Sequence, residues 1–132
     1  MNNLRTNTSS YPTTNSNVFN NKINTEQMFE YAIEQANAGN DTKAMEIARE
    51  SLISAKQNNL YVAIYIHGFM AALSLDKLDL GTARIHVYNA MNRLNKDHFS
   101  YNIDKNYLTA LLSLIEKQDP EVKQLKFENM AA

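Results

Sequence analysis

Three histidines, His67, His86 and His98, are the side chains of this sequence best suited to holding a metal ion or passing a proton. A helix presents two histidines to one metal ion when they stand four residues apart, and no two of these histidines have that spacing. The chain also has no cysteine that could complete a zinc site. We therefore expect no metal and no other cofactor. His86 interrupts an otherwise apolar helix face, and our hypothesis is that it makes folding or binding sensitive to pH near neutrality.

Carboxylates recur on one predicted helix, at Glu26, Glu30 and Glu34. Residues four apart lie on the same face of a helix, so this stripe resembles the carboxylate ligands of a di-metal helical bundle. Such bundles also need a Glu-x-x-His pair on each of two helices, and the sequence contains none. We interpret the stripe as a solvated acidic face.

Motifs for phosphate binding and for nucleophilic catalysis are absent from the sequence. The three glycines, Gly39, Gly68 and Gly81, stand too far apart to form a GxGxxG or a Walker loop. No pattern places a serine on the strained turn that presents a nucleophile. We therefore expect a protein that is not an enzyme.

The composition indicates one small protein with little net charge. Its 132 residues are 44% hydrophobic, which is enough for the core of a single domain. Thirteen Lys and Arg stand against fourteen Asp and Glu, so a formal charge of -1 gives no field that would attract nucleic acid or anionic lipid. We expect a protein or peptide partner, with neither nucleic acid nor membrane. The absence of cysteine and of a secretory hydrophobic region favours the cytoplasm.

The beginning of the chain differs from the rest. Residues 1–22 are rich in Asn, Ser and Thr and poor in large apolar side chains. Such a segment buries too little apolar surface to offset the loss of chain entropy. We predict a disordered tail over 1–22 and a helical domain over 23–132.

The sequence repeats itself at an interval of 39 residues, which becomes visible when Met28, His67 and Asn106 are placed in one column. Small residues then recur where two helices would approach closely. The first column of small residues contains Ala32, Ala71 and Ala110, and the second contains Ala44, Ala83 and Val122. The repeat predicts that one helical hairpin is used three times.

Apolar residues around these columns follow the spacing of amphipathic helices. The face predicted for the second helix consists of Ala44, Ile47, Ala48, Ser51, Leu52 and Ala55, and the face predicted for the fourth consists of Ala83, His86, Val87, Ala90, Met91 and Leu94. Turn signals separate the segments, such as Gly39-Asn40-Asp41 and Asp119-Pro120-Glu121. We predict six helices and no strand: 25–38, 42–57, 60–77, 81–96, 102–117 and 120–129.

A small residue, a Gly-Asn turn and an alanine twelve residues after the small residue occur in the first unit, as Ala32, Gly39, Asn40 and Ala44. The second unit repeats most of this pattern, as Ala71, Asp79, Ala83 and Ala90. The pattern resembles the tetratricopeptide repeat (TPR), well over residues 25–97 and poorly over 102–129. The resemblance implies an all-α fold of stacked antiparallel hairpins. The chain departs from that family in its longer interval, since the family repeats every 34 residues, and in a third unit that has Val122 and no turn glycine.

The resemblance also implies a concave groove lined by the first helix of each hairpin. The apolar and aromatic groove positions that we select as partner-binding are Phe29, Ile33, Tyr65, Ala72, Leu75, Tyr107, Leu111 and Leu114, and Gly68 is a further groove position. The Lys, Asn and Arg set that grips a free carboxylate in one subfamily is absent. The groove therefore suits an amphipathic helix or an extended apolar segment, as in an adaptor, an assembly factor or a small chaperone. Its other candidate occupants are the chain's own tail and a second copy in a homodimer.

Two other classes of function have sequence features in their favour. Residues 57–75 carry no charge and approach the roughly 20 apolar residues of a membrane span, although we interpret this run as the central helix of the stack. A helical transcriptional regulator would use Arg84, Arg93 and Lys96 to contact phosphates. The sequence shows no basic recognition helix with base-reading side chains.

Overall fold

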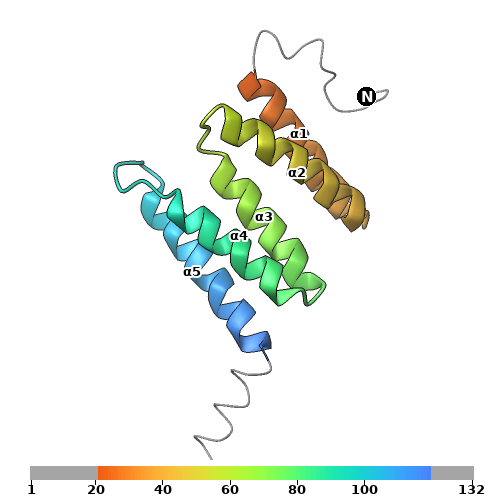
Figure 1. Ribbon diagram of the computed structural model, residues 1–132, viewed down its shortest axis with the longest axis vertical. Coiled ribbons are helices and arrows are strands. Elements are labelled where there is room, and N and C mark those ends of the chain that lie inside the picture. Colours follow the sequence, from red (N-terminus) through yellow and green to blue (C-terminus); the bar gives the residue numbers. More distant parts are fainter. Residues whose placement is uncertain (1–20, 120–132) are drawn as a thin grey trace, which may run out of the picture. The chain divides into compact units, whose positions relative to one another are not determined.

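The computed structural model describes residues 21–119, with side chains from residue 24 onward, and over this range the chain forms α-helices and no strand. Figure 1 shows the five helices in chain order. They are α1 (Asn21–Asn37), α2 (Asp41–Gln57), α3 (Ala63–Asp76), α4 (Leu80–Asn92) and α5 (Tyr101–Gln118). The all-α prediction and its first five helices are confirmed. The sixth predicted helix, over 120–129, lies outside the described residues, as does the predicted tail except for residues 21 and 22, which begin α1.

The chain divides into two units, Met1–Ile66 and His67–Ala132. The first contains α1, α2 and the beginning of α3, and the second contains the rest of α3 with α4 and α5.

In the first unit, α1 packs against α2. The buried face of α2 consists of Ala44, Ile47, Ala48, Ser51, Leu52 and Ala55, which confirms the predicted face. Ser51 is fully buried, and its hydroxyl donates a hydrogen bond of 3.1 Å to the carbonyl oxygen of Thr25 on α1. A second bond joins the hydroxyls of Thr25 and Ser54. These bonds satisfy polar groups that would otherwise destabilise the interior.

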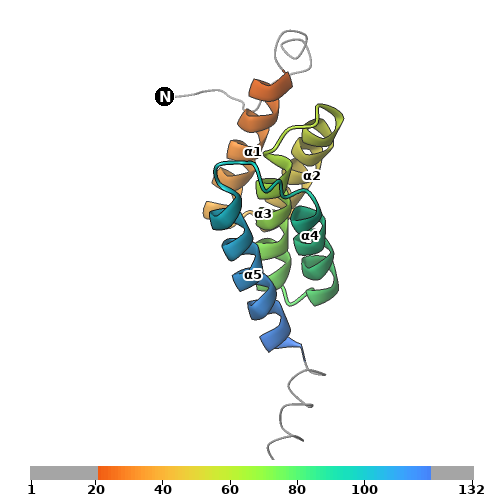
Figure 2. The same ribbon diagram turned by 90° about the vertical axis from the view of Figure 1, so that its left-hand side faces the viewer.

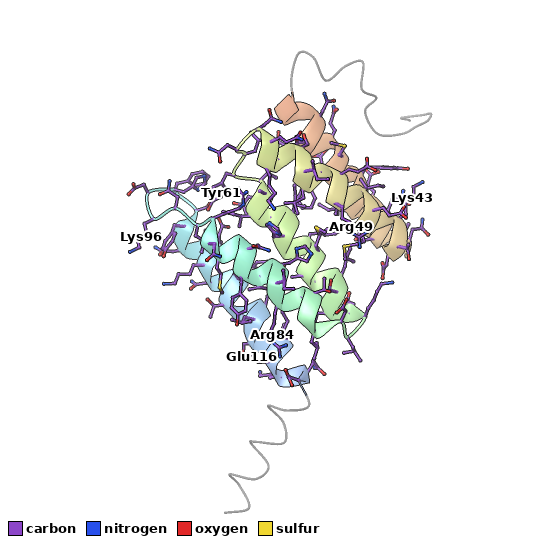
Figure 3. The ribbon with its side chains drawn as sticks, viewed as in Figure 1. Lys43, Arg49, Tyr61, Arg84, Lys96 and Glu116 are labelled. Atoms are coloured by element: carbon purple, nitrogen blue, oxygen red, sulfur yellow. The ribbon has the colours of Figure 1, made fainter. Side chains whose placement is uncertain are left out.

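In the second unit, α4 packs against α5, and α5 turns Asp104, Leu108, Leu111 and Ile115 into the core. Arg84 on α4 forms an ion pair with Asp119, which directly follows α5. In Figure 3, Arg84 extends toward that end of the helix. The fourth helix ends at Asn92 and not at 96 as predicted: the N–H groups of Arg93 and Leu94 bond to the carbonyl oxygens three residues back, those of Ala90 and Met91. Beyond the helix, the side chain of Asn95 accepts a hydrogen bond from the backbone of Asp97 in a local turn.

The predicted third helix begins at Ala63 and not at 60, because the preceding hairpin ends in a turn with Asn59 at φ 52°. The backbone N–H of Leu60 returns to the carbonyl oxygen of Ala55 at 2.8 Å, which closes the last turn of α2. Of the uncharged run 57–75, residues 63–75 therefore lie in α3, and residues 58–62 lie in the connection between α2 and α3. None of the helices within residues 21–119 has the length and apolar character that crossing a membrane would need.

The turn inside the hairpin has the same geometry in both units. Gly39 has φ 87°, and the N–H of Asn40 bonds to the carbonyl oxygen of Gln35 at 2.8 Å. Exactly one repeat interval later, Leu78 has φ 60°, and the N–H of Asp79 bonds to the carbonyl oxygen of Ser74 at 2.9 Å. The 39-residue interval therefore relates local backbone structure as well as sequence.

Leu78 to glycine is expected to raise the free energy of unfolding by about 1 kcal/mol, because a left-handed conformation costs an L-residue about 1–2 kcal/mol and glycine is spared most of that cost. Leu78 is 66% exposed, so the change removes little packing. Urea unfolding followed by far-UV circular dichroism measures the difference. The matched control is Gly39→Ala, where a Cβ would meet nothing within 4 Å and which should lower stability through the backbone alone. A lower stability for Leu78→Gly would contradict the explanation.

Candidate partner interface

The helices α3 and α5 approach each other closely at Gly68. A Cβ on this residue would lie 3.2 Å from Cε2 of Tyr107 and 3.9 Å from Cδ2 of Leu108. Gly68 and Tyr107 stand one repeat interval apart, so the first helices of two successive hairpins meet at equivalent positions. Figure 2 shows α3 and α5 running alongside each other in the second unit. The absence of a side chain at Gly68 gives the Tyr107 ring a place to lie.

The predicted partner-binding residues divide between the two units. In the first unit, Phe29 and Ile33 are half-buried on α1, and Tyr65 is 40% exposed at the start of α3. In the second unit, Ala72 and Leu75 are half-buried on α3.

The three predicted residues on α5 differ in their access to a partner. Tyr107 is 53% exposed and Leu114 is 49% exposed, so both offer apolar surface. Leu111 is only 6% exposed because it packs into the core of the second unit. A partner lying on this helix would therefore contact Tyr107 and Leu114, while Leu111 supports them from below.

Two further residues extend this surface and were not among the predicted set. Ile103 is 73% exposed and Ala110 is exposed. At 100° per residue, the four side chains fall within an arc of about 60°. We call the set Ile103, Tyr107, Ala110 and Leu114 the α5 stripe. The α5 stripe borders the buried face of the same helix. The apolar side chains of α5 therefore cover a wider arc than the part of the helix that packs into the core of the second unit.

A signal for the α5 stripe is present in the sequence YNIDKNYLTALLSLIEKQ. Apolar residues occur at the core positions 108, 111 and 115 and also one residue before each core position. A helix that buries one face against a core needs only one such series. The second series leaves Ile103, Tyr107 and Leu114 exposed on the surface of α5.

A pair of histidines joins α3 to α4 inside the second unit. Nδ1 of His67 lies 3.0 Å from Nδ1 of His86, and the ring centroids are 5.3 Å apart. His67 is 1% exposed and His86 is half-buried. One ring must donate and the other accept, so the hydrogen bond cannot survive when both rings are protonated. The pH hypothesis for His86 stays a prediction, and the structure identifies His67 as its neighbour.

The histidine pair brings only two ring nitrogens together. Between residues 24 and 119, no group of three or more His, Asp or Glu side chains has a geometry that could hold a metal ion. A zinc site usually takes three or four protein ligands. The pair forms a hydrogen-bonded contact between α3 and α4.

Ser, His and Asp meet at the beginning of α5, although sequence reasoning placed His98 only in a turn. The Ser100 hydroxyl lies 2.6 Å from Oδ2 of Asp104, to which it donates, and 2.8 Å from Nδ1 of His98. In a hydrolytic triad the histidine stands between the serine and the carboxylate, whereas here the serine stands in the middle. Ser100 and Asp104 are also 7% and 6% exposed. This geometry suits the fixing of the first turn of α5, where the helix dipole favours a carboxylate.

Arg84 has a role within the fold. The DNA-binding alternative assigns this side chain to phosphates, and the structure pairs it with Asp119. Its charge is thereby compensated within the second unit.

Comparison with known proteins finds no relative of the chain. The resemblance to tetratricopeptide repeats stays a prediction from residue spacing. The structure shows turns and buried alanines one 39-residue interval apart. Ala32, Ala44, Ala71 and Ala83 all have 0% exposure. No protein-family model, no curated protein and no solved structure matches the chain.

Proposed function

We propose that this protein is a non-enzymatic interaction module that holds an apolar helix or an extended apolar segment of a partner protein. Its role would be that of an adaptor, an assembly factor or a small chaperone acting in the cytoplasm. The proposal includes TPR-like stacking of hairpins, with a sixth helix over 120–129. The observation that carries it is the α5 stripe, whose three large apolar side chains are 49% to 73% exposed.

The α5 stripe contains one side chain, Tyr107, of a type that contributes strongly to protein recognition. Tyr107 offers a large ring with few rotatable bonds, and aromatic residues are enriched among the energetically dominant positions of interfaces. Leu114 offers a branched apolar side chain one helical turn beyond Ala110. The spacing of these side chains matches that of the anchors on an amphipathic helix. Half-buried Ala72 and Leu75 lie on α3, the helix that Tyr107 contacts.

The test is partner capture with the double variant Tyr107→Ala/Leu114→Ala. We expect its affinity for the captured protein to fall at least about tenfold, because truncating a dominant side chain near the centre of an interface costs about 2 kcal/mol or more. The measurement is affinity capture from native lysate, identification by mass spectrometry and titration of the purified partner. Both side chains are about half exposed, so far-UV helicity should not change.

The control is the double variant Ile85→Ala/Tyr88→Ala on α4. Ile85 is 60% exposed and Tyr88 is 48% exposed, so the control removes similar apolar surface from a different helix. It should capture the partner as the parent does. Full capture by the α5 variant, or equal losses in both variants, would contradict the proposed binding face.

A further inference from the structure

The α5 stripe is complementary to itself. Its members are separated by four, three and four residues, a spacing that reads the same in both directions along the helix. An antiparallel second copy therefore presents the same series in register. We propose that a second copy of this chain docks on the α5 stripe, with the two α5 helices antiparallel. This inference rests on the proposed function, because both treat the α5 stripe as a binding face. It goes further by naming the partner that the face binds.

The side-chain sizes fit this arrangement. With the two-fold axis midway along the stripe, Ile103 of one copy lies opposite Leu114 of the other, and Tyr107 lies opposite Ala110. The largest side chain of the stripe thus meets the smallest, and the ring has room between the helices. Alternation of large and small residues allows two helices to interlock. In a parallel pair Tyr107 would face Tyr107 and Ala110 would face Ala110, which leaves a clash beside a gap.

The charges also permit this arrangement. Asn106 and Ser113 border the stripe on its solvent side and are uncharged. The nearest charge on that side is Lys117, and the antiparallel register sets it beside the first turn of the other α5, away from the second Lys117. No like charges are therefore brought face to face. In the antiparallel pair, the partly positive N-terminus of each α5 also lies beside the partly negative C-terminus of the other, which is a favourable arrangement.

The extent of the surface predicts a weak dimer. One helix face with four principal side chains is smaller than the roughly 800 Å² per partner of a standard stable interface. Phe99, which is 95% exposed in the turn just before α5, adds apolar area. We expect a concentration-dependent equilibrium, with dissociation constants in the micromolar range or weaker.

Sedimentation equilibrium and light scattering over about 1 µM to 1 mM test the association, a range that brackets micromolar dissociation constants. The weight-average mass of the full chain should rise from 15.0 kDa toward twice that value. Ala110→Glu should hold the mass at that of one chain, because each copy would set a carboxylate against the apolar ring of Tyr107. Thr109→Glu, on the exposed polar face of α5, should associate like the parent. Both positions are exposed, so both variants should fold, as far-UV circular dichroism checks.

Disulfide trapping tests the orientation, since the chain has no cysteine of its own. We expect Ile103→Cys mixed with Leu114→Cys to form a covalent dimer on mild oxidation. Each variant oxidised alone should cross-link much less, because like positions in the antiparallel pair lie about 16 Å apart along the helices, beyond the roughly 7 Å between Cα atoms that a disulfide spans. Cross-linking of each variant alone as fast as in the mixture would overturn the antiparallel arrangement.

A mass that stays at one chain across the range would overturn the proposal, whether the chain's own remaining residues or another protein covers the stripe. The proposed function is tested separately. If the chain is monomeric and a different protein still depends on Tyr107 and Leu114, the binding face stands and the second copy is wrong. If the mass doubles but no other protein is captured, the second copy stands alone.

Discussion

Ile115 to alanine is expected to lower the free energy of unfolding by about 2–5 kcal/mol, the range found when a buried isoleucine or leucine is truncated in a core. Ile115 has 0% exposure and lies on the buried face of α5. Its loss removes apolar contacts and leaves a cavity that the surrounding helices fill only in part. Because small proteins are stable by only about 5–15 kcal/mol, this one change should unfold much of the second unit at modest urea concentrations.

The matched control for this prediction is the preceding residue, Leu114→Ala. Leu114 is 49% exposed and belongs to the α5 stripe, so its truncation should change stability by less than about 1 kcal/mol. Urea unfolding at low protein concentration compares the two variants without a contribution from association. Equal losses would show that both faces of α5 are covered within one chain, which would contradict the exposed stripe.

The amphipathic helices were predictable because local sequence determines them. The buried face of α2 follows the helical period without interruption, and all six of its predicted residues are buried. On α4 the prediction was less complete. Ala83, Val87 and Ala90 are buried, whereas Leu94 lies beyond the end of the helix and is half-buried. The change of backbone hydrogen bonding at Arg93 and the Asn95 turn beyond it are local features that hydrophobic periodicity does not encode.

Contacts between helices are harder to predict from the sequence than the helices themselves. The sequence places His67 in a column with Met28 and His86 on an otherwise apolar helix face, and the structure brings the two rings together. The spacing of the repeat did not reveal this pair, because members of the His67 column differ in burial: His67 is buried, whereas Asn106 is exposed. Their pairing depends on how α3 and α4 cross, which residue spacing alone does not specify.

The repeat predicts the environment of residues in the third hairpin less well than in the first two hairpins. Ala110 shares a column with Ala32 and Ala71, and the repeat therefore predicted a close helix contact at all three positions. Ala32 and Ala71 have 0% exposure, whereas Ala110 is exposed. A shared column implies a shared environment only where each hairpin has the same neighbours. The exposure of Ala110 is the reason that the α5 stripe was not recognised from the sequence.

This difference makes Ala71→Leu and Ala110→Leu an informative pair. Ala71→Leu adds three carbon atoms at a position with 0% exposure and is expected to lower the free energy of unfolding by about 1–3 kcal/mol or more, because a close-packed interior must shift to accept them. Urea unfolding with far-UV circular dichroism measures the loss.

Ala110→Leu makes the same chemical change on an exposed helix surface, so it should alter stability by no more than about 0.5 kcal/mol. Alanine and leucine also have similar helix propensities, which leaves packing as the main difference between the two variants. The comparison belongs at protein concentrations low enough for one copy to stay alone. A loss of stability at Ala110 as large as that at Ala71 would mean that the third predicted hairpin repeats the packing of the second hairpin. It would also mean that the α5 stripe is covered within the chain. A negligible loss at both positions would mean instead that the small-residue column does not mark a close approach of helices, and the main structural support for the 39-residue repeat would fail.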